Sequence, residues 1–239
     1  MSIKNRLDAV SQSIAASARA CHRNPDDIHL VAVSKKHDSE RVWTAIQAGA
    51  RIFGENYVQE ARDKIAEINN LLQDYPQMLN VSWHFIGHLQ RNKAKYAVRL
   101  FDLIHSVDNT ALLSEINHCA QKYEKCQDIL IQVSTGELSK SGISSESLES
   151  LIQMAVTLPN IRLCGLMIMP PYSQNPENSR PYFQKLARLL KQLKSQCKNQ
   201  NNHPLNHLSM GMTGDYPVAI QEGATYVRVG TAIFGDREK

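Results

Sequence analysis

A lysine at the end of an apolar strand has the clearest capacity for chemistry in this sequence. Residues 30–35 read Leu-Val-Ala-Val-Ser-Lys, and such a run is typical of a strand that is covered on both faces. Alternation puts Val31, Val33 and Lys35 on one face, so the Lys35 ammonium would lie at the rim of a core. Partial burial disfavours the charged amine, and a neutral amine attacks carbonyl carbons. Lys35 is therefore a candidate for Schiff-base formation; the alternative is a strand-closing lysine that reaches into water.

Two glycine-containing segments near the C-terminus could hold a phosphate. The first contains Ser209 and Gly211 and opens a helix, and the second contains Gly230 and Thr231. Glycines let backbone N–H groups approach an anion, hydroxyl groups add donors, and a helix N-terminus contributes its dipole. Either segment alone also fits a tight turn with a helix cap. Because they follow the seventh and eighth predicted strands, a phosphate site is the favoured interpretation.

Arg228 interrupts the apolar run of the last predicted strand. A guanidinium inside a barrel strand is costly unless it meets a partner. By alternation Arg228 shares a face with Gly230, so it would face the same cavity one step deeper. A permanently charged donor at that point suits a heteroaromatic nitrogen or a carboxylate. The alternative is an ion pair with a helix residue outside the barrel.

A reactive lysine, a phosphate cradle and a donor between them describe a site for pyridoxal 5′-phosphate (PLP). Lys35 would hold the cofactor as a Schiff base, Ser209, Gly230 and Thr231 would hold its phosphate, and Arg228 would bond the pyridine nitrogen. An arginine keeps that nitrogen unprotonated, so the ring is a poorer electron sink than it is beside a carboxylate. We therefore expect restrained carbanion chemistry.

The elements that must position these residues alternate between strand and helix. An amphipathic N-terminal helix carries Ile3, Leu7, Val10 and Ile14 at helical spacing. Eight strands are expected after it, at 30–35, 51–54, 83–87, 102–107, 129–133, 162–169, 207–210 and 226–233. Eight alternations in 239 residues predict a single (β/α)8 TIM barrel of the α/β class, although an open doubly wound sheet would share the pattern. No Pro-, Gly- or Ser-rich linker divides the chain, so we expect one domain over residues 1–239.

In such a barrel the active site lies at the C-terminal ends of the strands. These ends nominate a ring of residues: Lys35, Glu55, Asn56, Gly87, His88, Ser106, Ser134, Thr135, Met169, Ser209, Gly211, Gly230 and Thr231.

Composition narrows the class of protein further. A net charge of +4 is mild for 239 residues and gives no case for nucleic acid, which needs basic residues gathered on one face. The five cysteines match neither a zinc pattern nor a disulfide framework. No apolar run approaches the roughly 20 residues of a membrane span, and the N-terminus lacks the apolar centre of a signal peptide. We expect a cytoplasmic protein that does not bind membranes.

Seven segments resemble one known family, the YggS/PROSC family of pyridoxal phosphate homeostasis proteins. They are 32–35 (AVSK), 53–60 (FGENYVQE), 83–93 (WHFIGHLQRNK), 139–142 (SKSG), 165–167 (GLM), 209–212 (SMGM) and 227–235 (VRVGTAIFG). The resemblance spans nearly the whole chain, and the segments are long and specific. One mild departure is 213–215 (TGD), which leaves the contacts of Thr213 and Gly214 open.

The resemblance implies a fold-type III PLP-binding barrel like the N-terminal domain of alanine racemase. It further implies PLP on Lys35, a role in vitamin B6 balance by buffering or delivering PLP, and no established catalysis. Asn56 and Gly211 join the residues expected to bind the cofactor. Lys140 matches a second lysine of the family and could take part in cofactor capture or release; the alternative is a solvated loop lysine. Transient PLP-dependent apo-enzyme partners and a monomeric state are also expected.

Other functions are less well supported. A PLP-dependent amino-acid racemase is the enzymatic alternative, but related racemases take a catalytic tyrosine from an additional β domain, and the chain ends at Lys239. We therefore expect a binding protein, with a weak racemase-like side activity left open. A metal site at His84, His88 and His105 is disfavoured because i, i+4 spacing in a strand does not make a compact pair. The short basic helix 91–99 is more typical of a solvated face than of a nucleic-acid site.

Overall fold

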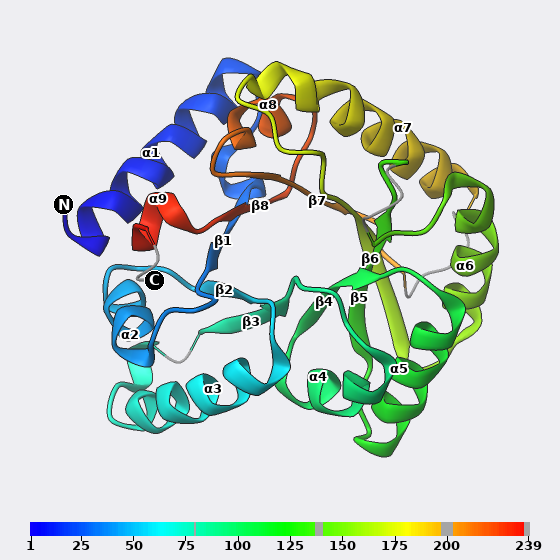
Figure 1. Ribbon diagram of the computed structural model, residues 1–239, viewed down its shortest axis with the longest axis horizontal. Helices are drawn as coiled ribbons and strands as arrows, with labels where there is room; N and C mark the ends of the chain where they lie inside the picture. Colours follow the sequence, from blue (N-terminus) through cyan, green and yellow to red (C-terminus); the bar gives the residue numbers. More distant parts are fainter. Residues whose placement is uncertain (79, 137–140, 197–202, 237–239) are drawn as a thin grey trace.

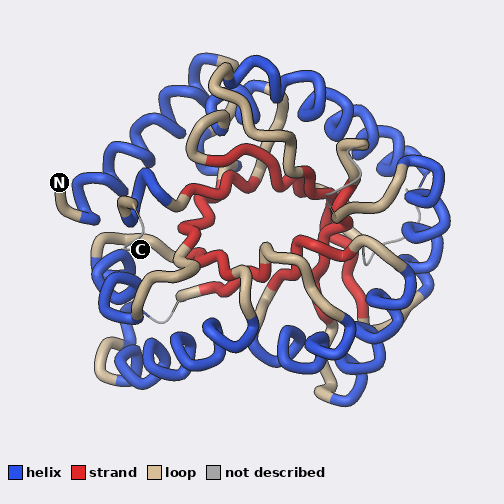
Figure 2. The backbone as a smooth tube through the Cα atoms, in the orientation of Figure 1, coloured by secondary structure: helices blue, strands red, loops and turns tan. Residues whose placement is uncertain are grey.

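Eight parallel strands close into a barrel in the order β1 to β8. The computed structural model describes residues 1–78, 80–136, 141–196 and 203–236. Viewed along the barrel, the strands form an inner ring and the helices an outer one (Figures 1 and 2). The strands are β1 (His29–Val33), β2 (Ile52–Glu55), β3 (Ser82–Phe85), β4 (Leu103–Val107), β5 (Gln127–Val133), β6 (Ile161–Ile168), β7 (His207–Met212) and β8 (Tyr226–Val229). The closed order confirms the predicted barrel and excludes the open sheet.

The helices cover the outside of this barrel. They are α1 (Ile3–Ala20), α2 (Ser39–Gln47), α3 (Val58–Gln73), α4 (Ala94–Leu100), α5 (Thr110–Lys122), α6 (Ser145–Thr157), α7 (Arg180–Gln196), α8 (Tyr216–Gln221) and α9 (Thr231–Phe234). Short 3-10 turns lie at η1 (Pro25–Asp27), η2 (Pro76–Met78), η3 (Arg91–Lys93) and η4 (Pro176–Ser179). Most helices bury one apolar stripe; on α3 this stripe includes Ala61, Ile65 and Ile68. None of the described helices is long and apolar enough to cross a membrane.

The inside of the barrel is more polar than is usual for this fold, where branched aliphatic side chains dominate. Ring contacts across the interior join residues of β1, β3, β4, β7 and β8, namely His29, His84, His105, His207 and Tyr226. A small apolar cluster lies beside them, formed by Leu103, Leu130, Cys164 and Met167. The main hydrophobic core lies instead between the strands and the outer helices. The barrel interior is therefore suited to hydrogen bonding as well as to packing.

Several predicted boundaries differ from the structure; the first strand, for example, ends at Val33, two residues before Lys35. The seventh strand continues to Met212, so Gly211 lies within it. The eighth strand ends at Val229, and Gly230 precedes the short helix α9; extension of that strand to residue 233 was wrong. The predicted basic helix is split into η3 and α4. After the eighth strand, Ile233 N and Phe234 N donate to Gly230 O, so the chain forms a helical turn there in place of a longer strand.

Helix α1 packs across the closure of the barrel. It contacts α8, α9 and α2, so the first and the last described helices lie side by side (Figure 1). Ser2 caps the helix by accepting a hydrogen bond from Asn5 N. Leu7, Val10 and Ile14 are buried, which confirms the predicted N-terminal amphipathic helix.

Candidate functional site

Lys35 lies two residues beyond the end of β1, in a turn. Ser34 N donates to Gly54 O at 3.1 Å, so Ser34 still pairs with β2, and His37 N donates back to Ser34 O at 3.1 Å. Lys35 itself is half-buried, as expected for a side chain at the rim of the barrel. The next residue, Lys36, has a φ of +63°, which turns the chain sharply away from the strand direction.

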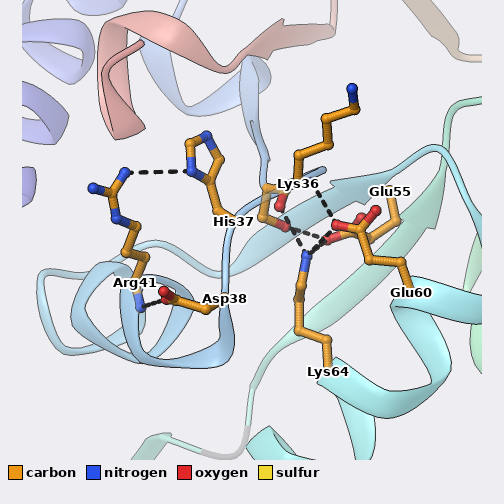
Figure 3. Close-up of polar contacts among 8 residues, drawn as sticks. Lys36, His37, Asp38, Arg41, Glu55, Glu60 and Lys64 are labelled. Carbon is orange, nitrogen blue, oxygen red and sulfur yellow. Dashed lines mark hydrogen bonds and ion pairs between the residues drawn. The ribbon is translucent and has the colours of Figure 1, made fainter. Parts of the chain in front are cut away.

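An ion-pair cluster between β2 and α3 holds the turn that carries Lys35 (Figure 3). Lys64 Nζ donates to Ser34 O at 2.8 Å, to Glu55 Oε1 at 2.6 Å and to Glu60 Oε1 at 3.0 Å. Ser34 Oγ also donates to Glu55 Oε1 at 2.7 Å, and Lys36 N donates to Glu60 Oε1 at 2.5 Å. The backbone on both sides of the candidate lysine is thus tied to one helix.

The electrostatics of this cluster are dominated by burial. Glu55 is fully buried and Lys64 is 4% exposed. Burial raises the pKa of the Glu55 carboxyl, and the positive charge of Lys64 together with its hydrogen bond opposes that rise. Lys64 was not among the functional residues predicted from the sequence. The sequence feature that could have indicated Lys64 is its position on the apolar stripe of α3, three residues after Ala61, where a charged side chain is unusual.

Arg228 points into the barrel, as alternation predicts. It is 4% exposed, and it donates to Ser209 Oγ at 2.5 Å and to Ile168 O at 3.0 Å. Both acceptors are uncharged and belong to barrel strands, so these contacts do not support the alternative of an ion pair with an outer helix. Burial lowers the pKa of Arg228 to about 10, while the negative charge of Asp215 opposes the shift. At neutral pH the side chain is therefore a buried cation.

The predicted phosphate residues fall into two groups. Gly230 and Thr231 lie at the mouth, where the Thr231 hydroxyl is 3.4 Å from that of Thr213. A Cβ at Gly230 would lie 3.3 Å from Val33 O, so this glycine adjoins the end of β1. Ser209 is fully buried and lies deeper, between Arg228 and His105. The structure therefore groups Ser209 with the guanidinium, and its role toward a phosphate stays a prediction.

Gly211 occupies a backbone conformation that favours glycine, with a φ of +88°. A Cβ at this position would lie 2.6 Å from Ala219 Cβ and 2.9 Å from Tyr216 Cα. Gly211 thus lets α8 approach β7 closely.

Asn56 follows β2 at the same end of the barrel. Its Oδ1 atom is buried and has no hydrogen-bond partner among the described residues, and the same is true of Ser106 Oγ and Thr135 Oγ1. All three belong to the ring of strand-end residues nominated from the sequence. A buried polar atom without a partner is costly. These atoms are available to a polar ligand at the barrel mouth.

A pocket of about 560 Å³ lies beside this mouth. Asn56 lines it together with Tyr57, Val58, Gln59, Phe85, His88, Leu89, Gln90 and Lys93. Lys35 and Arg228 are not part of its wall. Lys140, the predicted capture residue, lies outside the described residues; nearby in sequence, Ser141 Oγ lies 3.1 Å from His88 Nδ1.

The three histidines considered for a metal site are divided between two places. His105 Nε2 lies 3.0 Å from His84 Nδ1 inside the barrel, whereas His88 contacts Ser141 at the mouth. Among the described residues no group of three His, Cys, Asp or Glu side chains could hold a metal ion. Burial lowers the pKa of His84 to about 3 and that of His105 well below its usual value. Both imidazoles are neutral at physiological pH.

Sequence relatives identify the family. The family model for the N-terminal domain of alanine racemase matches residues 6–238. The pyridoxal phosphate homeostasis protein of Aquifex aeolicus is 39% identical over 239 residues and covers 100% of both chains. The Escherichia coli K12 protein of the same name is 38% identical over 237 residues, with 99% of this chain and 97% of the relative covered. This chain belongs to the family of pyridoxal phosphate homeostasis proteins, which share the N-terminal domain of alanine racemase. The resemblance drawn from the sequence segments is confirmed.

Solved structures agree with the family and the fold. The structure of PipY from Synechococcus elongatus with PLP bound has a TM-score of 0.82 at 35% identity, and the match covers 98% of this chain and all of PipY. Alanine racemase from Streptomyces lavendulae has a TM-score of 0.69 at 16% identity, which shows the shared barrel alone. The match covers 98% of this chain and 60% of the racemase chain.

The residues of the mouth fit the chemical groups of PLP. Lys35 offers an amine at the rim, and Arg228 offers a buried charge whose described acceptors are neutral. Gly230 and Thr231 form the start of α9, where the first backbone N–H groups have no partner within the helix. The unsatisfied atoms of Asn56, Ser106 and Thr135 add polar positions. A phosphorylated heteroaromatic aldehyde matches this donor set.

Proposed function

We propose that this protein binds PLP reversibly at Lys35 and buffers or delivers it within vitamin B6 metabolism. The observation that carries the proposal is the buried guanidinium of Arg228 beneath the strand-end residues, with neutral acceptors at its described contacts. A buried cation of this kind is stabilised by a ligand that accepts its hydrogen bonds. The PLP-bound structure of a full-length relative, PipY, supports the choice of ligand.

Each residue of the site then has a defined task. The Lys35 amine is the attachment point, and the cluster around Lys64 fixes the turn that carries it. Arg228 donates to the ring nitrogen, and the first backbone N–H groups of α9 together with the Thr231 hydroxyl donate to the phosphate. When bound, PLP supplies an aldehyde that forms a Schiff base with an amine and a ring that withdraws electrons. A guanidinium at the ring nitrogen restrains that withdrawal, which suits storage better than turnover.

Absorption and mass spectrometry test the binding proposal. After PLP is added to the purified chain, we expect a visible absorption band that borohydride abolishes. Peptide mapping of the reduced protein should place the added mass on Lys35, and the adjacent Lys36 serves as an internal control. A colourless sample, or an adduct on Lys36 in place of Lys35, would refute the proposed anchor.

The proposal also holds that the protein acts as a binding protein and not as an enzyme, with a weak racemase-like side activity left open; an amino-acid racemase is the alternative. Racemisation needs an acid and a base on opposite faces of a carbanion. Loss of the Cα proton of L-alanine in D₂O, followed by NMR with PLP-loaded protein, separates the two functions. Exchange that disappears in Lys35→Ala would favour the racemase.

The proposal also covers the domain organisation, the oligomeric state, the partners and the location of the protein. We infer a single domain over residues 1–239, a monomer, and transient contacts with PLP-dependent apo-enzymes that receive the cofactor. A cytoplasmic location is proposed because the described cysteines Cys21, Cys119, Cys126 and Cys164 are unpaired, as expected for reduced thiols. Sedimentation with and without PLP checks the monomeric state.

A further inference from the structure

A continuous line of buried hydrogen bonds runs across the barrel interior from Arg228. Arg228 Nη1 donates to Ser209 Oγ at 2.5 Å, Ser209 Oγ lies 2.8 Å from His105 Nδ1, and His105 Nε2 lies 3.0 Å from His84 Nδ1. The exposed fractions of these four side chains are 4%, 0%, 0% and 4%. Four different strands supply them: β8, β7, β4 and β3. The line therefore crosses the whole interior of the barrel.

The chemistry of the four groups gives this line a direction. A guanidinium has only donors, so the Ser209 oxygen must accept from Arg228, which leaves its one proton to donate to His105 Nδ1. A neutral His105 that accepts at Nδ1 carries its proton on Nε2 and donates it to His84 Nδ1. The opposite direction would make Ser209 accept twice and leave its proton without a described acceptor. One proton arrangement thus satisfies all three contacts while both imidazoles remain neutral.

We propose that His105 is a positioning residue for cofactor binding, because it orients the Ser209 hydroxyl so that the oxygen faces Arg228 and fixes the guanidinium toward the ring nitrogen. This inference rests on the proposed binding of PLP. It assigns Ser209 to the guanidinium as well as to the predicted phosphate set. It also explains how a buried cation is held in the absence of a described carboxylate contact: the supporting dipoles are neutral and point the same way.

A purely structural role for His105 is the competing explanation. Its ring lies 5.0 Å from that of His84 and 5.6 Å from that of Tyr226, so it also fills the interior. Two substitutions separate packing from hydrogen bonding. Asn places an amide where Nδ1 lies and can still accept from Ser209, whereas Gln places its amide nearer to the Nε2 position. Their sizes differ by one methylene, but only Asn retains the contact that the proposal requires.

The experiment measures PLP binding to the full chain with His105→Asn, His105→Gln and His105→Leu. We expect His105→Asn to keep the wild-type absorption maximum and a dissociation constant within about 3-fold. His105→Gln and His105→Leu should shift the maximum and weaken binding by about 10- to 100-fold, as expected when a hydrogen bond that supports a charged group is lost. Equal constants and equal spectra for all three variants would overturn the positioning role.

A second measurement keeps the inference testable if the variants do not fold. Nitrogen-15 NMR of histidine-labelled wild-type protein reports which ring nitrogen of His105 carries the proton. A proton on Nε2 supports the assigned direction, and a proton on Nδ1 overturns it. Failure of the wild-type chain to bind PLP would refute the proposed function and this inference together, whereas wild-type binding with unchanged His105→Leu spectra would refute only the inference.

Discussion

Replacing Lys64 by methionine tests whether the buried cluster holds the turn around Lys35. The Lys64 side chain is 4% exposed, and its ammonium contacts Ser34 O, Glu55 Oε1 and Glu60 Oε1. Methionine keeps much of the side-chain volume but removes the charge and all three donors. The Glu55 carboxylate, which is fully buried, is then left with the Ser34 hydroxyl as its described donor. An uncompensated buried charge is the expected defect.

The expected cost follows from that defect. Removing one partner of a buried ion pair destabilises proteins by about 3–5 kcal/mol. In a chain of this length each kcal/mol lowers Tm by about 2–4 °C, so Lys64→Met should lower Tm by about 6–20 °C. A second substitution, Glu55→Gln, removes the stranded charge. The double variant Lys64→Met/Glu55→Gln should therefore be more stable than Lys64→Met alone, although it contains one more change.

Thermal unfolding of the four combinations, followed by circular dichroism without PLP, provides the assay. Lys185→Met, on the exposed face of α7, is the matched control and should change the free energy of unfolding by no more than about 0.5 kcal/mol. A Lys64→Met variant as stable as Lys185→Met would show that the cluster contributes little. A double variant less stable than Lys64→Met would refute the argument from an uncompensated carboxylate.

Three further predictions concern pH, backbone conformation and thiol reactivity. Burial lowers the pKa of His84 from its usual 6.5 to about 3, so between these pH values the unfolded chain binds more protons than the folded one. As the pH falls from 6.5 to 5, this group should lower the free energy of unfolding by about 2 kcal/mol. In denaturant titrations, His84→Gln should make the free energy of unfolding depend less steeply on pH. Gly211 has a φ of +88°, and a Cβ there would lie 2.6 Å from Ala219 Cβ, so Gly211→Ala should lower the free energy of unfolding by about 2–5 kcal/mol. Gly214→Ala is the control and should be tolerated, because its Cβ would meet open space. Equal melting curves for the two variants would contradict this prediction. Cys126 is exposed, while burial raises the pKa of Cys164 to about 12. Brief alkylation read by mass spectrometry should therefore modify Cys126 before Cys164, and faster labelling of Cys164 would be inconsistent with its burial.

The outline of the barrel could be predicted because its strands are short, apolar and regularly separated by amphipathic helices. Local pattern was less reliable where tertiary packing decides the conformation. The run from Val229 to Phe234 is apolar and favours a strand, but the chain turns at Gly230 and forms a helix. The helix after Gly230 packs against α1, and such tertiary contacts cannot be predicted from the local sequence.

In the candidate site, too, local pattern predicted some features, whereas others depend on tertiary contacts. The inward direction of Arg228 followed from simple alternation and is borne out by its contacts. The pairing of His84 with His105 depends on the register between β3 and β4, and spacing along the chain does not specify register. Lys64 was missed because its partners include Glu55, nine residues earlier, and only the folded chain shows that a charged residue on an apolar stripe is compensated.

Because β1 pairs with β8, the proposed cofactor site lies where the first and last strands of the barrel meet. Lys35 follows the first strand and Gly230 follows the last, and residues such as Val31 and Arg228 pair across that junction. The two halves of the site are therefore about 195 positions apart along the chain and meet only when the ring of strands is complete. A ligand that bridges this junction would bind the closed barrel and not the unclosed one, so it would stabilise closure by mass action. Occupancy of the site would then report that the last strand has docked.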